Sequence, residues 1–167
     1  HATDPVGTIR ANLAGTFSVR ALRAQKSSRG CVFMSSAEVY GAQPPGTELI
    51  SETSFGGFDI LNPRACYSEG KRAAETVSAT YAAQHGLTCR IVRFGHIYGP
   101  GRALDDGRVQ ADFAANVVQG RDIVLNSDGS AVRTYTYVAD AIVGMFTALL
   151  VGTEMAYNVA DPNGYVS

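Results

Sequence analysis

Two long stretches of the chain carry apolar residues at helical spacing between residues typical of helix ends. The first covers about 4–26 and opens at Asp4-Pro5, an acidic residue that can cap a helix followed by proline at the first turn. The second covers about 62–85, opens at Asn62-Pro63 and stops before Gly86, the residue favoured for a left-handed helix end. The apolar residues that predict the buried side of the first helix are Val6, Ile9, Leu13, Phe17 and Leu22.

A short continuous apolar run lies between these helices, and another candidate for a buried strand follows the second helix. Cys31–Met34 and Cys89–Phe94 have the composition of strands buried on both faces of a parallel sheet. Further elements are expected as helices at about 109–120 and 140–150, strands at 123–125 and 132–138, a turn at 127–129 and a strand near the end of the chain. The alternation of helices and buried strands predicts an α/β fold with a mostly parallel sheet.

Composition is that of a folded protein of about one domain, since 46% of the 167 residues are hydrophobic and 17% are charged. Lys and Arg number 14 against 15 Asp and Glu, a balance that disfavours nucleic acid as a partner. The longest apolar run, 141–151, is shorter than the roughly 20 residues that span a bilayer, so no membrane contact is expected. No secretory signal is recognisable, which favours a cytoplasmic location.

The three cysteines, Cys31, Cys66 and Cys89, are widely spaced and embedded in apolar segments. Such a pattern favours reduced thiols in the core over a disulfide framework, and it predicts no metal site.

The spacing Tyr67-Ser68-Glu69-Gly70-Lys71 places a phenol and an ammonium one turn apart on one face of the second helix. A phenol is a weak base at neutral pH, and a neighbouring cation favours its phenolate form. The same spacing also occurs by chance on the surface of many helices. Other residues must therefore decide whether it is catalytic.

A hydroxyl and a carboxylate follow the first predicted strand, in the segment Ser35-Ser36-Ala37-Glu38. Ligands of doubly wound sheets bind beyond the carboxyl ends of the strands. Ser36 and Glu38 are therefore expected to share a crevice with Tyr67 and Lys71, which could hold a sugar hydroxyl and remove its proton. Each of these residues alone would be interpreted as an ordinary structural or solvated group.

Taken together, these motifs resemble those of the extended short-chain dehydrogenase/reductases that act on nucleotide sugars, the NAD-dependent epimerase/dehydratase family. The similarity covers essentially the whole chain in order. It is carried by Asn12 with Gly15-Thr16, Ser35 to Gly41, Asn62 to Arg72, Arg93 through Tyr98-Gly99-Pro100, and Arg133 before Tyr137-Val138-Ala139-Asp140.

The resemblance implies a Rossmann-type, doubly wound sheet, of which this chain holds the later part, with a small C-terminal substrate-binding region. It implies a bound NAD and oxidation of the sugar at C4, with Tyr67 as the base, Lys71 on the cofactor ribose and Ser36 on the reacting hydroxyl. Ser35, Tyr67 and Lys71 would contact the cofactor. Arg133, Arg108 and His96 would contact the nucleotide-sugar substrate, expected to be a UDP-sugar.

Within the family the chain is most similar to UDP-glucuronate decarboxylases, especially over Pro63 to Lys71 and Asp106 to Val109. A glutamate at the position of Glu38 assists the middle step of decarboxylases and of 4,6-dehydratases, and epimerases commonly lack it. Ala37 replaces the aspartate usual in dehydratases, and His96 replaces a family asparagine. Decarboxylation is therefore favoured, with 4-epimerisation and 4,6-dehydration as alternatives.

No glycine-rich dinucleotide loop follows a strand anywhere in the sequence. We expect that loop to lie N-terminal to His1, with 1–95 forming the later part of the NAD-binding domain. Residues 96–167 would then combine the nucleotide-sugar region with returning Rossmann elements. The alternative of another class is a truncated, non-catalytic binding or oligomerisation module. By resemblance, the helices at 4–26 and 62–85 would form a homodimer.

Overall fold

The computed structural model describes residues 3–26, 30–44, 46–47, 49–101, 103–105, 107–125, 128–129 and 132–166. The chain divides into two compact units. The first unit comprises the described residues within 1–95 and 143–159, and the second comprises those within 96–142 and 160–167. The predicted turn at 127–129 lies partly outside the described residues.

The sheet of the first unit is parallel throughout and has the strand order β1-β2-β5. Strand β1 (Cys31–Ser36) pairs with β2 (Cys89–Phe94) in a register that opposes Cys31 to Cys89 and Ser36 to Phe94. Strand β5 (Ala156–Val159) lies along the other side of β2. The central position of β2 explains its apolar middle, because Ile91 and Val92 are buried almost completely.

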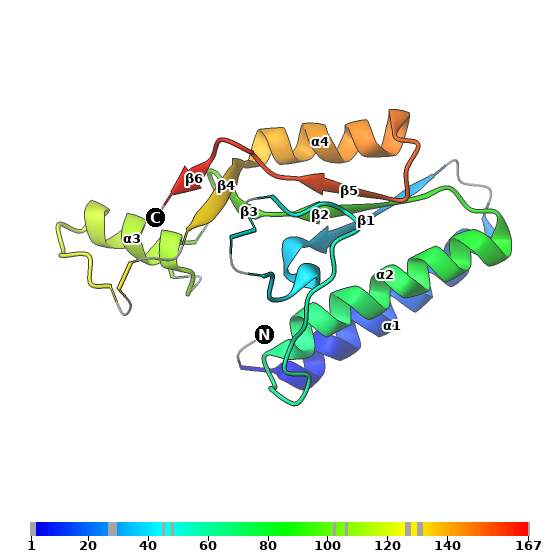
Figure 1. The fold of residues 1–167 in the computed structure, drawn as a ribbon, viewed down its shortest axis with the longest axis horizontal. Helices are drawn as coiled ribbons and strands as arrows, with labels where there is room; N and C mark the ends of the chain where they lie inside the picture. Colours follow the sequence, from blue (N-terminus) through cyan, green and yellow to red (C-terminus); the bar gives the residue numbers. More distant parts are fainter. Residues whose placement is uncertain are drawn as a thin grey trace. The chain divides into compact units, whose positions relative to one another are not determined.

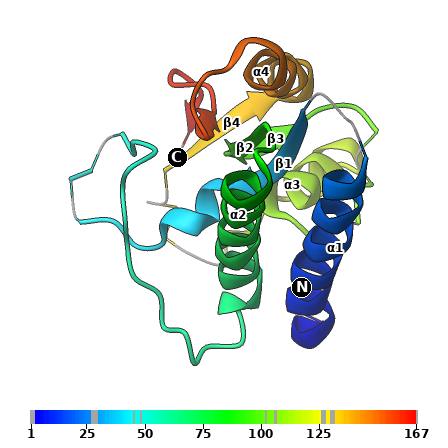
Figure 2. The same ribbon diagram turned by 90° about the vertical axis from the view of Figure 1, so that its right-hand side faces the viewer.

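Helices cover both faces of this sheet, which confirms the predicted α/β class (Figure 1). Helices α1 (Pro5–Gln25) and α2 (Ala65–His85) lie side by side along one face, as both views show (Figures 1 and 2). The later residues of α4 (Val138–Val151) lie on the opposite face, where Gly144 allows close approach to Val159 of β5. The segment β1-α2-β2 is thus a parallel crossover unit.

The ends of the long helices follow the predicted chemistry. Asp4 caps α1 by accepting a 2.8 Å hydrogen bond from the backbone N–H of Gly7. Gly86 ends α2 in the left-handed conformation, with φ 62° and ψ 33°. Helix α2 begins at Ala65, later than predicted, because Asn62 forms a turn in which its side chain accepts from the N–H of Arg64.

The buried side of α1 differs from the predicted one. Thr16 and Arg20 are the buried residues of this helix, whereas Val6, Phe17 and Leu22 are exposed. Apolar residues occur around most of the helix, so its periodicity did not identify the face that meets α2 and β1.

The second unit contains strands β3 (His96–Tyr98), β4 (Arg133–Tyr137) and β6 (Tyr165–Val166) in the order β3-β4-β6. Strand β3 is parallel to β4, and β6 is antiparallel to it. Helix α3 (Val109–Val118) buries Ala111 and Ala115. The strand predicted at 123–125 is wrong, because these residues form no strand and their side chains are largely exposed.

Within the described part of the chain, no helix is both long enough and apolar enough to cross a membrane.

Candidate active site

The carboxyl end of β1 turns directly into a short 3-10 helix, η1 (Ala37–Tyr40). The side chain of Ser36 caps this helix, because its Oγ accepts a 3.2 Å hydrogen bond from the backbone N–H of Glu38. The buried side chains of Val39 and Tyr40 anchor the other side of η1. Strand end and cap therefore fix the backbone that carries both the Ser36 hydroxyl and the Glu38 carboxylate.

Tyr67 and Lys71 lie in the first half of α2, beside the end of β1. The Lys71 ammonium donates to the carbonyl of Met34 at 2.8 Å and lies 5.8 Å from the centre of the Tyr67 ring. The Phe33 ring lies 5.0 Å from the same nitrogen. Burial among these groups lowers the pKa of Lys71, although the Glu75 carboxylate opposes the shift.

A direct contact joins η1 to α2. The hydroxyl of Ser68 donates to Oε2 of Glu38 at 3.2 Å, one residue after Tyr67. Ser68 is buried, so its hydroxyl holds the carboxylate from one side. The structure thus brings Ser36, Glu38, Tyr67 and Lys71 to one end of β1 within the first unit.

Arg72 ties η1 and the irregular segment 41–64 to α2 through two backbone carbonyls and one aromatic ring. Its Nε donates to the carbonyl of Val39, and its Nη2 donates to the carbonyl of Gly56, both at 2.6 Å. The guanidinium also stacks on the Phe58 ring at 4.1 Å. An ion pair with Glu69 on the outer side of α2 is longer, at 3.6 Å.

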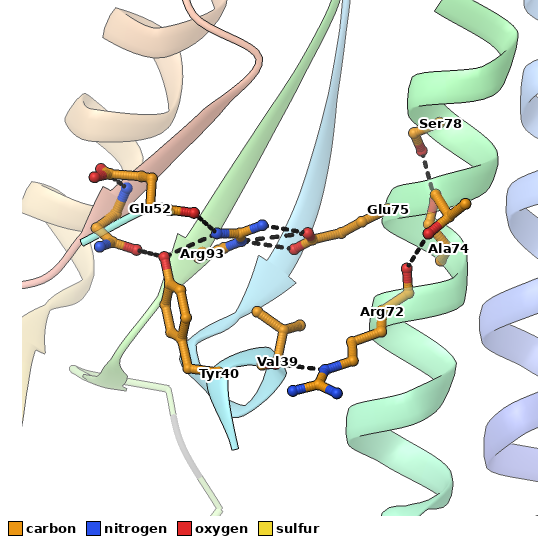
Figure 3. A network of polar contacts seen from close by, with 10 residues as sticks. Val39, Tyr40, Glu52, Arg72, Ala74, Glu75, Ser78 and Arg93 are labelled. Atoms are coloured by element: carbon orange, nitrogen blue, oxygen red, sulfur yellow. Dashed lines mark hydrogen bonds and ion pairs between the residues drawn. The ribbon is translucent and has the colours of Figure 1, made fainter. Parts of the chain in front are cut away.

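A second polar cluster lies behind the site and connects five segments of the chain (Figure 3). Arg93 of β2 forms a largely buried ion pair with Glu75 of α2, with an Nη2–Oε2 distance of 2.7 Å. Its Nη1 donates to the Tyr40 hydroxyl at 2.9 Å and to the Glu52 carbonyl at 2.8 Å. The Tyr40 hydroxyl in turn donates to Asn158 of β5 at 2.6 Å.

The pKa values of two groups in this cluster, the Arg93 guanidinium and the Tyr40 hydroxyl, are both raised, for different reasons. The hydrogen bonds with Glu75 raise the pKa of Arg93 above its ordinary value, despite burial. Burial raises the pKa of Tyr40, although Arg93 opposes that shift. Both groups therefore stay protonated at neutral pH, and the cluster serves as a fixed scaffold behind the site.

One buried hydroxyl of the site region has no hydrogen-bond partner among the described residues. Ser35 is 5% exposed, and its Oγ is unsatisfied. A buried polar atom without a partner is costly, so this atom suits a polar ligand beside β1. Together with the cationic Lys71, it fits the predicted contact with a dinucleotide cofactor.

The three predicted substrate residues lie in the second unit. Arg108 precedes α3 and lines a cavity of about 320 Å³ together with Tyr98, Pro100 and Val138. His96 on β3 packs against the Tyr135 ring with centres 5.5 Å apart. Arg133 on β4 is exposed and donates to the carbonyl of Val132.

Several polar residues of the site were missed as contributors by the sequence pattern. Ser68 lies inside a predicted motif without a predicted role, and Glu52 and Asn158 come from distant segments. Glu75 offered one signal, since it follows Lys71 by one helical turn on an otherwise small and apolar face. A lone acid on such a face calls for a buried cation, which proves to be Arg93.

Comparison with known proteins adds the following similarities. A family model described as the NAD dependent epimerase/dehydratase family matches residues 1–160. UDP-glucuronic acid decarboxylase 6 of Arabidopsis thaliana is 33% identical over 162 residues, which cover 97% of this chain and 46% of that protein. UDP-glucuronic acid decarboxylase 1 of Xenopus tropicalis is 31% identical over 95% of this chain and 37% of that protein. The chain thus spans about half the length of these relatives, or less.

Solved structures share the fold. UDP-glucose 4-epimerase of Thermus thermophilus, solved with NAD, has a TM-score of 0.80 and is 30% identical, over 95% of this chain and 51% of that one. The dTDP-glucose 4,6-dehydratase of Bacillus anthracis, also solved with NAD, has a TM-score of 0.81 at 22% identity, over 95% and 49% of the two chains.

Proposed function

Because this chain belongs to the NAD-dependent epimerase/dehydratase family, we propose that the whole protein modifies a nucleotide sugar through a transient 4-keto intermediate. The observation that carries the proposal is the convergence of four chemically suited side chains at the end of β1. Ser36 supplies a hydroxyl there, Glu38 a carboxylate, Tyr67 a phenol and Lys71 an ammonium. Retention of such a set favours an enzyme over a binding or oligomerisation module.

Tyr67 is the proposed base that removes the proton of the sugar 4-hydroxyl. The Lys71 ammonium lies 5.8 Å from the centre of its ring, one helical turn further along α2. Lys71 is itself positioned by the Met34 carbonyl, which it holds at 2.8 Å. Ser36 is proposed to hydrogen-bond the reacting hydroxyl, since its Oγ stands at the strand end.

NAD is the cofactor of the family, and the neighbouring structures cited above contain it. When bound, NAD would supply reversible hydride acceptance at C4 of the sugar. Lys71, Tyr67 and the unsatisfied hydroxyl of Ser35 are the residues proposed to hold its nicotinamide end. The glycine-rich cradle for its pyrophosphate is a separate requirement, which the residues present do not provide.

Decarboxylation of UDP-glucuronate is the reaction we propose within this chemistry. A 4-keto sugar acid loses carbon dioxide readily, because the developing charge delocalises into the ketone. Glu38 supplies a carboxylate beyond the set that oxidation requires, and Ser68 keeps it in place. Ala37 offers no second acid for the elimination that a 4,6-dehydratase performs. The 31–33% identity to named decarboxylases supports the same choice.

The nucleotide-sugar contacts are proposed for the segment 96–167, and the cofactor contacts for 1–95. Arg108 and Arg133 carry guanidinium groups suited to bidentate binding of a diphosphate or a sugar acid. The part of the substrate that contacts Arg108 is proposed to bind in the cavity that this residue lines in the second unit. His96 is proposed as a further substrate contact from β3.

The reaction is tested by incubating full-length protein with UDP-glucuronate and separately with UDP-glucose, UDP-galactose and dTDP-glucose. We expect carbon dioxide and a UDP-pentose from UDP-glucuronate, identified by chromatography and mass spectrometry. A product of unchanged mass would identify an epimerase, and loss of water would identify a dehydratase. No turnover of any of them with NAD present would favour the non-catalytic module.

Glu38→Gln provides the site-specific test of this reaction. The amide keeps the hydrogen bond from Ser68 but cannot exchange a proton, so carbon dioxide release is expected to slow by about 10²-fold. Transient reduction of NAD should persist in this variant, because oxidation uses Tyr67. Unchanged release of carbon dioxide would remove Glu38 from the mechanism.

A further inference from the structure

A pair of thiols and two arginines gather at the opposite end of β1 from the candidate site. Cys31 begins β1 and Cys89 begins β2, and the two residues are direct partners in the parallel register. Five residues separate Cys31 from Ser36, roughly 16 Å along a strand. The thiol pair therefore does not belong to the sugar site.

The most unusual member of this cluster is Arg20 of α1. Arg20 is only 3% exposed, and no described carboxylate forms an ion pair with it. Its Nε donates to the Ser78 hydroxyl at 3.1 Å, and its Nη1 contacts Sγ of Cys31. A buried guanidinium needs an anionic partner, because its charge has given up water. The sulfur of Cys31 is the group beside it that can become anionic.

Cys89 and Arg23 also favour a thiolate at Cys31, whereas the Thr88 carbonyl accepts a long 3.6 Å hydrogen bond from the protonated thiol. A hydrogen bond from the Cys89 thiol lowers the pKa of Cys31 to about 6 despite partial burial, and the charges of Arg20 and Arg23 act in the same direction. Retention of that shared proton and burial raise the pKa of Cys89. Cys31 remains partly accessible, whereas Cys89 is buried.

We propose that Cys31 is a peroxide-reactive thiolate that forms a disulfide with Cys89. The Cys31 sulfur attacks a hydroperoxide, so that an S–O bond forms, the O–O bond breaks, and the leaving oxygen departs as water or an alcohol after taking up a proton. The sulfur is oxidised by two electrons and the peroxide is reduced. The Cys89 sulfur then displaces the oxygen of the sulfenic acid, forming the S–S bond and releasing water.

The strand register makes the second step feasible. Neighbouring strands lie about 4.8 Å apart, and this spacing falls within the Cα separations that disulfides span. Both residues are the first of their strands, so a small adjustment disturbs few hydrogen bonds. Among the described residues, Cys66 at the start of α2 contacts neither Arg20 nor a second thiol, and it serves as the internal comparison.

The test treats the full-length protein with hydrogen peroxide at pH 7, alkylates the remaining thiols and maps the peptides by mass spectrometry. We expect a linked Cys31–Cys89 peptide, which reductant separates, while Cys66 is still alkylated. In Cys89→Ser the Cys31 sulfenic acid should accumulate and react with dimedone. Oxidation of Cys66 at least as fast as Cys31, or oxidation of Cys31 without the link to Cys89, would overturn the proposal.

The role of Arg20 is tested by Arg20→Met, expected to slow Cys31 oxidation at pH 7 about tenfold, with Arg20→Lys staying within about threefold. A measurement without mutation covers the case in which Arg20→Met fails to fold. Alkylation of Cys31 in the unaltered protein should reach half its maximal rate near pH 6. Half-maximal alkylation near pH 8.5, about the ordinary thiol value, would contradict the thiolate.

Discussion

Tyr67 is the residue whose proposed role is most sharply separable from its structural one. Tyr67→Phe removes only the phenol oxygen and keeps the ring beside Lys71. We expect turnover to fall by about 10²-fold or more, because a positioned base is lost, while the thermal unfolding temperature changes little. Formation of NADH in a single turnover of full-length protein measures the loss. Near-normal turnover would mean that the spacing of Tyr67 and Lys71 is coincidental.

Loss of the Glu75 carboxylate, which pairs with Arg93, should destabilise the fold far more than loss of the Glu69 carboxylate, which pairs with Arg72. The first is largely buried with a 2.7 Å contact, whereas the second is about one-third exposed at 3.6 Å. Glu75→Gln leaves the Arg93 charge uncompensated, so we expect a loss of about 3 kcal/mol in the free energy of unfolding. Glu69→Gln is the matched control and should change it by less than about 0.5 kcal/mol.

Urea denaturation measures the change in the free energy of unfolding for both variants. The folded-state pKa of Arg93 lies above its ordinary value, so its contribution is complete below that ordinary value and is lost only at more alkaline pH. The penalty of Glu75→Gln should therefore be constant from about pH 6 to about pH 9. Equal effects of the two substitutions would show that the Arg93 cluster is not a stabilising scaffold.

Some residues of the site can be predicted from a short stretch of sequence, and others cannot. The Tyr67-Lys71 spacing and the strand-end position of Ser36 and Glu38 depend on one helix and one strand, so the sequence predicts them. Contacts such as that between Asn158 and Tyr40 join segments that are distant in the sequence. Periodicity carries no information about which distant segment supplies a partner, and such contacts emerge only from the fold.

In the long helices, the sequence predicts where a helix ends better than it predicts which face of the helix is buried. Asp4 and Gly86 mark real helix ends, because capping chemistry is local to a few residues. The face of α1 was predicted wrongly, since a buried Arg20 counts as polar in any pattern although it packs against Ser78 and Cys31. The short strand β3 was not predicted, because three residues establish no period.

Two glycines of the long helices should respond in opposite ways to the same substitution. An added Cβ meets nothing within 4 Å at either Gly86 or Gly15, so only the backbone conformation differs. Gly86 is left-handed, and Gly86→Ala is expected to cost about 1 kcal/mol. Gly15 lies within α1, where Gly15→Ala should add about 0.5–1 kcal/mol. Thermal denaturation of both variants measures the contrast, and a shift in the same direction for both would contradict it.

At the scale of the whole molecule, we propose that α1 and α2 form the homodimer interface. The exposed apolar residues of α1 include Phe17, which is 49% exposed and makes an edge contact with the Tyr81 ring of α2. An aromatic pair that spans two helices, with Phe17 exposed and Tyr81 half-buried, is suited to burial against a second copy. Phe17→Arg should therefore convert a dimer into monomers.

Sedimentation of full-length protein at several concentrations measures that change. Gln25→Arg adds the same charge at the exposed last residue of α1 and should leave the dimer intact. A monomeric unaltered protein, or a dimer that persists in Phe17→Arg, would place the interface elsewhere or remove it.

The contacts of Arg72 have a consequence for how this protein can diversify. Its guanidinium holds the carbonyls of Val39 and Gly56, which every amino acid possesses. Gly56 itself must stay small, because an added Cβ would lie 2.2 Å from the Ala42 carbonyl oxygen. Tyr40 and Glu52 between these anchor points are needed by the Arg93 cluster, whereas the tether of Arg72 makes no demand on the other described side chains there. Evolution or a designed library can therefore change those side chains while the backbone of the segment keeps its path beside the site.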